Sequence, residues 1–421
     1  MYYLLALFLF IFDATACTSN WDCALNGVCT SGSCACDAPW IDGPGGPCTA
    51  LDMLPAPISS CGPACAYHGN TTDLSGHPVN SSTWGARVLR TPDGSYRMAV
   101  NEYVYGCGLN TWRSNSQIAW TTSSTPMGPF TKLGVAVDAW ATNPTVFAVP
   151  ATGELVVVTC GDGYPCALGA ASTPSNNTPT CNNGMRCACV GPPAGSCHYV
   201  QPSANATSVF HFAPSLTAAD AGPFPWAPLN ATLINFTLGQ WIPSLVNPSP
   251  LILPNGTTLI MVHSAGTGGG GPVILRSVVG GTAGWRGPYE VMVTSQDHRW
   301  NGSAAGTEDP FLWVDARGNY HAMYHHLGGG FLGRHAWSAD GYTWSDTVPC
   351  YNNSFTLTDG TVLEPGANGG AQRPALLQDP TTLQPTHLFL AGATCSSSTH
   401  PTCLPGPYTM VVPLKFSSGR E

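Results

Sequence analysis

The fold of this chain is decided by the stretch Thr307-Glu308-Asp309-Pro310-Phe311-Leu312-Trp313-Val314-Asp315-Ala316-Arg317-Gly318-Asn319-Tyr320-His321-Ala322-Met323-Tyr324. It opens with polar residues followed by Pro, continues as an apolar and aromatic run, breaks at Arg317-Gly318, and resumes as a second hydrophobic run. Two such runs joined by a Gly-containing turn are typical of a β-hairpin. The stretch therefore predicts two antiparallel strands, with the acidic pair Glu308 and Asp309 at the start of the first.

The same pattern recurs at four other places in the chain. Three of them start with a polar residue followed by Pro, at Asn143, Asn247 and Arg373, and one starts at Trp84. In chain order the five starts lie 59, 104, 62 and 64 residues apart. Repeats of this length, each with several short strands and Gly turns, predict radial blades. We expect an all-β fold with a five-bladed β-propeller over residues 81–421, and an irregular β-sandwich is the alternative.

The longest interval contains a cysteine-rich insertion over residues 160–197. It holds six of the eighteen cysteines, and its Cys187-Ala188-Cys189 step has the spacing of a small disulfide knot. Dense cysteines in an exported chain favour disulfides, so we expect a second knot grafted on a propeller loop, with a metal cluster as the alternative. The six cysteines outside the two clusters, Cys395 and Cys403 among them, are expected to staple loops.

The N-terminus has the pattern of an export signal. Its apolar run from Tyr2 to Phe12 is too short to span a bilayer, and Ala14-Thr15-Ala16 supplies the small residues of a cleavage site. A basic n-region is missing, and a buried N-terminal strand is the alternative. The sequence also has nine glycosylation sequons, at Asn70, Asn80, Asn176, Asn205, Asn230, Asn235, Asn255, Asn301 and Asn352. With an even number of cysteines, these features predict a signal peptide over residues 1–16 and a secreted, extracellular glycoprotein.

Residues 17–48 are expected to form a small disulfide-rich module. Six cysteines, with a single residue between the fourth and fifth and Trp40 and Gly43 before the last, resemble the EGF-like module. That resemblance implies the pairs Cys17–Cys29, Cys23–Cys34 and Cys36–Cys48. A module of this size cannot bury an adequate core and depends on such bonds. The Pro-rich segment that follows is expected to be a linker over residues 49–80.

Charge excludes two classes of partner. Charged residues make up 9% of the chain, the formal net charge is -9, and fourteen Lys and Arg are thinly spread. Such a chain cannot build the basic face that a nucleic-acid binder requires. No basic amphipathic stretch or later run of eighteen apolar residues appears, so membrane insertion is not expected either. Abundant Trp, Tyr, Asn and Gly suit a sugar-facing surface, although most of the thirteen Trp are expected in the core.

Two stretches resemble the five-bladed propeller glycoside hydrolases, the relatives of arabinanases, β-xylosidases and invertases. The run from Thr307 to His321 resembles their inner-strand motif. The run His335-Ala336-Trp337-Ser338-Ala339-Asp340-Gly341-Tyr342-Thr343-Trp344 resembles their outer-strand signature, in which a Ser-x-Asp-Gly turn precedes Trp. The resemblance covers roughly residues 81–421. It implies a sugar-processing site where the inner strands converge on the propeller axis.

The resemblance also implies an acidic base, an acidic pKa modulator and a glutamate general acid on successive inner strands. Hydrolysis needs two carboxyl groups that flank the glycosidic bond. Glu308, two residues before Pro310, matches the general acid. Asn143 and Asn247 stand where the family usually has Asp, and an amide cannot accept a proton at neutral pH. The usual base is therefore missing from its expected position.

Other acidic residues are candidates for the missing base. Glu102 and Asp162 end the second strands of two blades, and Asp309 adjoins Glu308. A rim position is the alternative for Glu102 and Asp162, and turn capping is the alternative for Asp309. Arg373 matches an arginine that some relatives aim at the substrate, with a buried ion pair as its alternative. The predicted catalytic residues are thus Glu308, Asp309 and Glu102, and the predicted substrate contacts are Asn143, Asn247, Arg373 and Trp84.

These patterns support two hypotheses about function. The first is a secreted glycoside hydrolase-like protein that acts on cell-wall or extracellular polysaccharide at the propeller axis. The second is a catalytically inactive glycan-binding or adhesive protein whose EGF-like module makes protein contacts. No cofactor is expected, and a structural calcium ion is the alternative. The histidine cluster is interpreted as structural because no H-E-x-x-H motif is present, so no metal site is predicted from His321, His325, His326 and His335.

Overall fold

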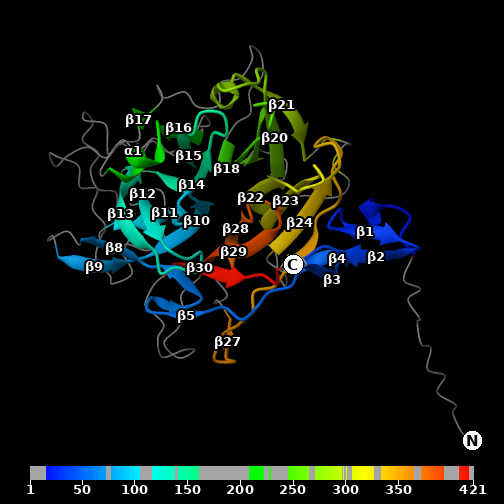
Figure 1. Ribbon diagram of the computed structural model, residues 1–421, viewed down its shortest axis with the longest axis horizontal. Helices are drawn as coiled ribbons and strands as arrows, with labels where there is room; N and C mark the ends of the chain where they lie inside the picture. Colours follow the sequence, from blue (N-terminus) through cyan, green and yellow to red (C-terminus); the bar gives the residue numbers. More distant parts are fainter. Residues whose placement is uncertain are drawn as a thin grey trace, which may run out of the picture.

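The computed structural model describes residues 16–72, 77–104, 116–137, 141–160, 208–221, 227–228, 245–264, 271–295, 297, 300, 306–326, 333–364, 371–392 and 407–416. In this part of the chain, five four-stranded antiparallel sheets surround a common centre (Figure 1). The first strands of neighbouring sheets contact one another around the whole ring. The predicted all-β fold with a five-bladed β-propeller is therefore confirmed.

Four of the blades are built from consecutive strands. Blade one is β10 (Thr83–Arg90), β11 (Tyr96–Tyr103), β12 (Ser116–Ser123) and β13 (Thr131–Val137). Blade two is β14 (Thr142–Ala148), β15 (Leu155–Cys160), β16 (Ser208–Ala213) and β17 (Ala227–Pro228). Blade three is β18 (Leu245–Ile252), β19 (Thr258–Ser264), β20 (Gly271–Ser277) and β21 (Tyr289–Thr294). Blade four is β22 (Thr307–Val314), β23 (Tyr320–His326), β24 (Gly333–Ser338) and β25 (Val348–Tyr351).

The fifth blade joins the two ends of the described chain. Its strands are β28 (Gln372–Gln378), β29 (Pro385–Gly392), β30 (Tyr408–Pro413) and, on the outside, β7 (Cys65–Tyr67). The strand β7 pairs with β30 and lies far upstream of it in sequence. A ring of blades that is closed by strands from both ends leaves no broken seam through which the sheets can separate.

The turns inside the blades follow the sequence prediction. Hairpins join the first and second strands of blades one to four, and each contains a glycine with φ between 71° and 85°, at Gly94, Gly153, Gly256 and Gly318. A side chain is strained in that conformation, and glycine is not. The turn glycines therefore mark the hairpins correctly.

The small N-terminal module consists of η1 (Asn20–Cys23), β1 (Gly27–Thr30), β2 (Ser33–Cys36), β3 (Trp40–Gly43) and β4 (Gly46–Leu51). Its disulfides are the three pairs that the EGF-like resemblance implies: Cys17–Cys29, Cys23–Cys34 and Cys36–Cys48. A fourth disulfide joins Cys61 to Cys65. The module lies against blade four, where Trp21 contacts Trp337 with ring centroids 6.0 Å apart. It is therefore docked on the propeller.

The segment predicted as a linker over residues 49–80 contains regular structure. It holds the end of β4, then β5 (Ile58–Ser59), β6 (Gly62–Pro63), β7, β8 (Gly69–Thr72) and β9 (Pro78–Ser81). Because β7 is a blade strand, the propeller draws on residues well before position 81, and the predicted boundary is corrected. The cysteine-rich insertion lies almost wholly outside the described residues, apart from Cys160 at the end of β15.

Apolar side chains fill the spaces between adjacent blades. One cluster joins blades two and three, one joins blades one and two, and one joins blades three and four; the largest also contains residues of the module. The rings of Trp120, Trp285 and Trp344 are at most 1% exposed. Fully burying such a side chain contributes roughly 1.5–3 kcal/mol. As predicted, these tryptophans are part of the hydrophobic core.

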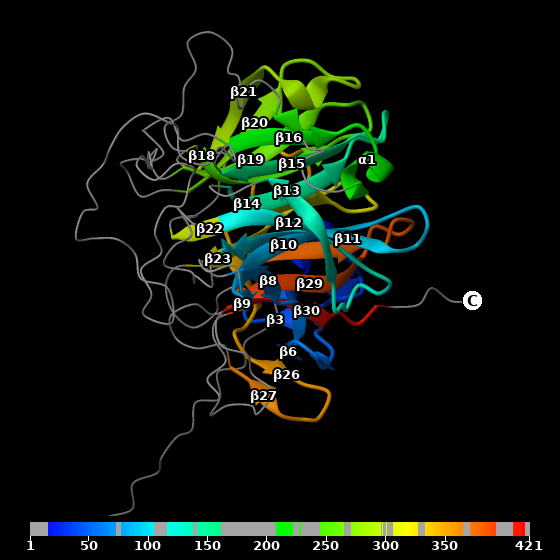
Figure 2. The ribbon, with the colours of Figure 1, turned by 90° about the vertical axis from the view of Figure 1, so that its left-hand side faces the viewer.

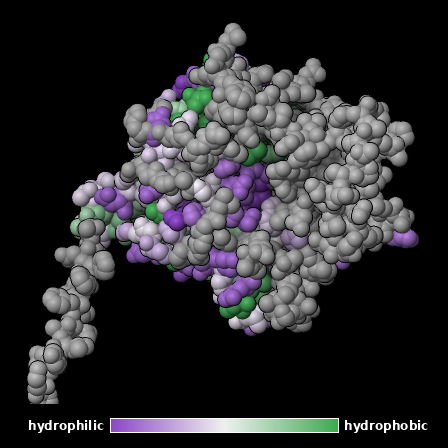
Figure 3. Space-filling view, turned by 180° about the vertical axis from the view of Figure 1, so that it is seen from behind, coloured by the Kyte–Doolittle hydropathy of each residue, from purple (hydrophilic) through white to green (hydrophobic). Residues whose placement is uncertain are grey.

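Side views show how the remaining parts lie on this core. The hairpin of β26 (Phe355–Thr356) and β27 (Val362–Leu363) projects from one end of the molecule (Figure 2). The short helix α1 (Leu216–Asp220) packs near β13 and β16. The face opposite to Figure 1 is hydrophilic over much of its described surface, with isolated hydrophobic spots (Figure 3). Among the described residues, no helix has the length and apolar character needed to cross a membrane.

Candidate functional site

One backbone feature is repeated on the inner strand of every blade. At the start of each strand the pairing register shifts, which marks a β-bulge. One residue in each bulge has a positive φ: Gly85 (70°), Asn143 (58°), Asn247 (56°), Asp309 (54°) and Arg373 (51°). Bulges re-aim side chains and are frequent next to active sites. In four blades the positive φ falls on the first bulge residue, so Asn143, Asn247, Asp309 and Arg373 are structural equivalents, whereas in blade one it falls on the second, Gly85.

The side chains at these positions meet one another. Asn143 donates a hydrogen bond from Nδ2 to Oδ1 of Asn247. Nδ2 of Asn247 in turn lies 3.5 Å from Oε1 of Glu308. Nη1 of Arg373 lies 3.4 Å from Oδ1 of Asn247. Nη1 of Arg373 also donates to Oδ1 of Asp309 at 2.9 Å. The structure thus brings together five of the seven predicted site residues, from four blades, in one polar cluster, here called the axial cluster.

Glu308 is half-buried in the axial cluster, and its pKa is raised to about 7. Burial of the carboxyl group is the largest cause, because it penalises the charged form. The negative charge of Asp309 adds to the rise, while Arg373 and the hydrogen bond from Asn247 oppose it. A carboxylic acid with this pKa keeps its proton up to neutral pH, as a general acid must.

Asp309 has a different environment. Its side chain is 7% exposed and forms an ion pair with Arg373, whose side chain is 10% exposed. His325 lies on the other side, with Nδ1 3.8 Å from Oδ2 of Asp309. One ligand atom from each of Glu308, Asp309 and His325 lies within 4.8 Å of the others, so these three are the residues that a cation would use. Arg373 already neutralises Asp309, and for that reason we assign no metal here.

Glu102 belongs to a separate network. Its carboxylate is fully buried and accepts hydrogen bonds from Tyr67, the backbone N–H of Asn70 and Gln117, at 2.9, 2.9 and 2.7 Å. Lys132 forms an ion pair with it. These contacts occupy both carboxylate oxygens, so Glu102 anchors the N-terminal segment to blade one. Its predicted role as a catalytic partner is not supported by this placement.

Two further predictions concern Trp84 and Asp162. Trp84 precedes the bulge residue of blade one and is 5% exposed, which leaves only an edge of its indole for contact with a ligand. Its neighbour Gly85 lies against the side chain of Arg373, where an added Cβ would be 2.5 Å from Nε. Asp162 lies outside the described residues.

Sequence reasoning missed one residue that borders the axial cluster. His325 was interpreted as structural, yet it borders Asp309 and its Nδ1 has no hydrogen-bond partner in the described part of the chain. Burial lowers the pKa of His325. In the hairpin, His325 is paired with Glu308. Counting outward from the turn at Gly318 would therefore have placed His325 beside the acidic pair.

Comparison with known proteins was made at three levels. No protein-family model matches the chain, and no curated protein sequence matches it. A family 117 glycoside hydrolase from the marine bacterium Zobellia galactanivorans has a similar structure, with 11% identity, 84% of this chain and 91% of that chain covered, and a TM-score of 0.50. This likeness establishes the fold. It agrees with the resemblance to propeller glycoside hydrolases found in the sequence.

Two further solved structures have weaker likeness. They are the endo-arabinase from Bacteroides thetaiotaomicron, with 13% identity, coverage of 84% and 100%, and a TM-score of 0.44, and the α-L-arabinofuranosidase from Lactobacillus brevis, with 10% identity, coverage of 80% and 92%, and a TM-score of 0.45. These two likenesses carry no argument about the chain, whose activity is argued from its own axial cluster.

Proposed function

We propose that the protein is a secreted glycoside hydrolase that cleaves a cell-wall or extracellular polysaccharide at the axial cluster, with Glu308 as the general acid. The observation that carries this proposal is the position and pKa of Glu308. It lies where the inner strands meet, and its pKa is raised to about 7. A proton held at neutral pH can pass to the glycosidic oxygen as the bond to the leaving sugar breaks.

Asp309 is the carboxylate that we assign as the partner of Glu308. The two carboxyl groups approach within 4.8 Å. Inverting glycosidases separate their carboxyl groups by about 6.5–9.5 Å to hold a water, whereas retaining enzymes separate them by about 5–5.5 Å. The spacing here is closer to the retaining arrangement. In that mechanism Asp309 would attack the anomeric carbon, and water would then hydrolyse the glycosyl ester while Glu308 takes up its proton.

The test is cleavage of arabinan, xylan, fructan and galactan oligosaccharides, followed through released reducing ends. We expect the wild-type protein to cleave at least one of them and Glu308→Gln to lose roughly 10²-fold or more of that rate, the usual contribution of a general acid. Glu290→Gln is the matched control, because Glu290 forms an outer-surface ion pair with Arg276. NMR of the first product should show a retained anomeric configuration.

A second candidate is glycan binding without turnover. It is favoured by the amides of Asn143 and Asn247 at two positions of the axial cluster, since amides hydrogen-bond sugar hydroxyls and cannot act as bases. Wild-type protein that binds an oligosaccharide in calorimetry and releases no reducing ends would replace the first proposal with this one. An inverted product would instead assign the base to a group other than Asp309.

A further inference from the structure

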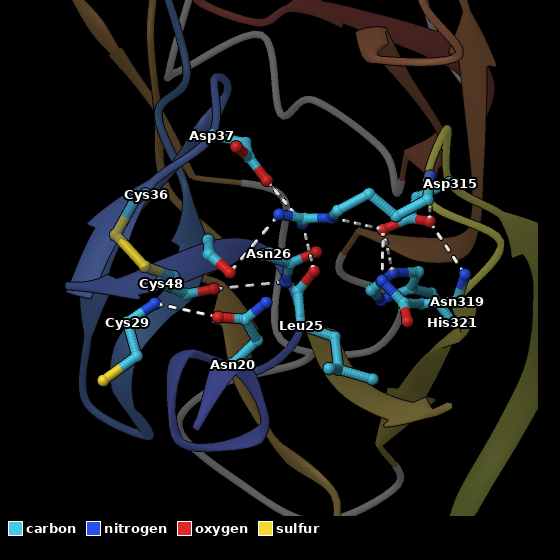
Figure 4. A network of polar contacts seen from close by, with 12 residues as sticks. Asn20, Leu25, Asn26, Cys29, Cys36, Asp37, Cys48, Asp315, Asn319 and His321 are labelled. Carbon is cyan, nitrogen blue, oxygen red and sulfur yellow. Dashed lines mark hydrogen bonds and ion pairs between the residues drawn. A yellow bond between two sulfur atoms is a disulfide. The ribbon is translucent and has the colours of Figure 1, made fainter. Parts of the chain in front are cut away.

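A pocket lies at the junction between the disulfide-rich module and the propeller, away from the axial cluster. Its volume is about 150 Å³, and three segments line it. The module contributes residues that include Asn26, Asp37 and Trp40. The end of β22 and the turn after it contribute Trp313 and residues 315–317, and the turn between β28 and β29 with the start of β29 contributes residues 382–385. Figure 4 shows Asp37 and Asn26 of the module facing Asp315 of blade four. This pocket, here called the junction pocket, exists only because the module docks.

The junction pocket and the axial cluster lie at opposite ends of β22. Glu308 is near the beginning of that strand, and Asp315 follows its last residue. A strand advances about 3.3 Å per residue, so roughly 20 Å separates the two sites. A ligand in the junction pocket would therefore leave the axial cluster open.

The walls of the junction pocket are fixed by Arg317. Its guanidinium donates to the backbone carbonyls of Leu25 and Gly27 and forms an ion pair with Asp37, all in the module. On the propeller side it lies 3.5 Å from Asp315. One side chain thus ties the two halves of the pocket together. A pocket that is rigid before binding costs a ligand less ordering free energy.

Two stacked indoles form the apolar wall. The rings of Trp40 and Trp313 are parallel within 4°, with centroids 6.4 Å apart. They are 5% and 2% exposed, and both line the pocket. An apolar wall beside convergent polar groups is the usual composition of a small-molecule site.

Polar atoms that have no hydrogen-bond partner among the described residues complete the pocket. Asn26 is 4% exposed and donates its Nδ2 to the carbonyl of Cys48 at 3.1 Å, which leaves its Oδ1 without a hydrogen bond among the described residues. In the same part of the chain, the side-chain amide of Gln384 makes no hydrogen bond, and Asp37 uses only Oδ2. The pocket therefore offers both donors and acceptors, which is the pattern that hydroxyl groups match.

The charged side chains and the volume of the pocket further restrict the class of ligand. Asp37 and Asp315 would repel an anion, and both are already paired with Arg317, so a cation would gain little by binding them. The ligand should therefore be neutral and rich in hydroxyl groups. The volume is below the range of about 300–1,000 Å³ that drug-sized ligands occupy, so the pocket has room for one small unit.

We propose that the junction pocket binds one neutral sugar residue of a polysaccharide, through Asn26, Asp37, Trp40, Trp313, Arg317 and Gln384. The choice of a polysaccharide as the source of this sugar rests on the proposed function. The existence of the pocket is independent of that function. Binding here holds the chain on the protein at a second point. The module then acts as half of a sugar site.

The test is photo-cross-linking of the full-length protein with arabino-, xylo-, fructo- and galacto-trisaccharides that carry a diazirine, followed by peptide mapping. We expect at least one probe to label peptides that contain residues 313–317 or 382–385, and this label should persist in Glu308→Gln. Gln384→Ala and Asp37→Asn each remove a polar contact and should reduce that label roughly three- to tenfold. Asp52→Asn is the matched control, because Asp52 also forms a surface ion pair, with Lys415, and does not line the pocket.

The outcomes separate this inference from the proposed function. Label at the axial cluster with none at the junction peptides would overturn the inference and leave the hydrolase proposal intact. Junction label that is the same in Asp37→Asn, Gln384→Ala and Asp52→Asn would also overturn it, because the contact would then be non-specific. Junction label in a protein that releases no reducing ends would support the inference while the hydrolase proposal fails.

Discussion

Glu308 and Asp309 are adjacent in the chain, yet their carboxyl groups experience opposite environments. Asp309 accepts a hydrogen bond from the guanidinium of Arg373 at 2.9 Å. Glu308 is half-buried beside that negative charge, and its pKa is raised to about 7. A raised pKa of this size suits Glu308 to donate a proton near neutral pH. The backbone bulge makes this possible because it turns the two side chains to different neighbours.

The pKa of Glu308 should respond in opposite directions to its two charged neighbours. Asp309→Asn removes a negative charge that raises the pKa, so we expect a fall of about one pH unit. Arg373→Met removes a positive charge that lowers it, so we expect a rise of similar size. The titration of the Glu308 carboxyl carbon by ¹³C NMR measures both, independently of activity. Asp315→Asn, at the far end of β22, should change nothing. Equal shifts in all three variants would contradict the assigned contacts.

The residues of the axial cluster differ in how far the sequence predicts them. Asn143, Asn247, Asp309 and Arg373 each precede Pro at a blade start, and this local pattern was enough to align them. The role of Glu102 depends on contacts with Tyr67 and Asn70, which are distant in sequence. No local pattern in the chain reports such contacts.

The inner strand is the element that places the axial cluster, and its bulge requires a positive φ. Asn and Asp tolerate this conformation better than most residues, whereas Arg373 adopts it at a steric cost of roughly 1–2 kcal/mol. In blade one the positive φ falls on the second bulge residue, Gly85, and there the lack of a side chain leaves space for Arg373. The five bulges thus act together, because the residue in one blade fixes the side chain in the next.

Gly85→Ala should be more destabilising than the same change in an open turn. Gly85 and Gly94 have φ values of 70° and 85°, so an added Cβ carries a similar backbone strain of roughly 1–2 kcal/mol at both. At Gly94 nothing lies within 4 Å, whereas at Gly85 the Cβ would meet Nε of Arg373 at 2.5 Å. We expect Gly85→Ala to lower the free energy of unfolding by about 1 kcal/mol more than Gly94→Ala, the usual lower cost of overpacking. Urea denaturation measures the difference.

An equal loss of stability in the two variants would show that Arg373 does not occupy the space beside Gly85.

The predicted elements were most accurate for long strands with Gly turns, where the two-residue period and the turn chemistry agree. They failed for residues 49–80, since strands of two to four residues carry too little periodicity to separate them from a Pro-rich linker.

For the molecule as a whole, the two ends of the chain determine whether the ring closes. The outer strand β7 covers β30, and Tyr67 at its end and Asn70 in β8 are two of the partners of the buried Glu102 carboxylate. The module adds a second attachment through Arg317 and the stack of Trp40 on Trp313. The N-terminal segment and the module are therefore each attached to the propeller by their own contacts.

This closure predicts different results for two N-terminal truncations. A chain that begins at residue 81 loses β7, Tyr67 and Asn70, so β30 becomes an exposed edge and Glu102 stays buried with two partners removed. Each lost partner of a buried charge costs about 1–3 kcal/mol or more, against a total stability of about 5–15 kcal/mol. We expect this chain to aggregate, as measured by size-exclusion chromatography and circular dichroism.

A chain that begins at residue 52 loses the module and keeps β7, so it should stay folded with a lower Tm. If both truncated chains were monomeric with the same Tm, β7 would not be what closes the ring.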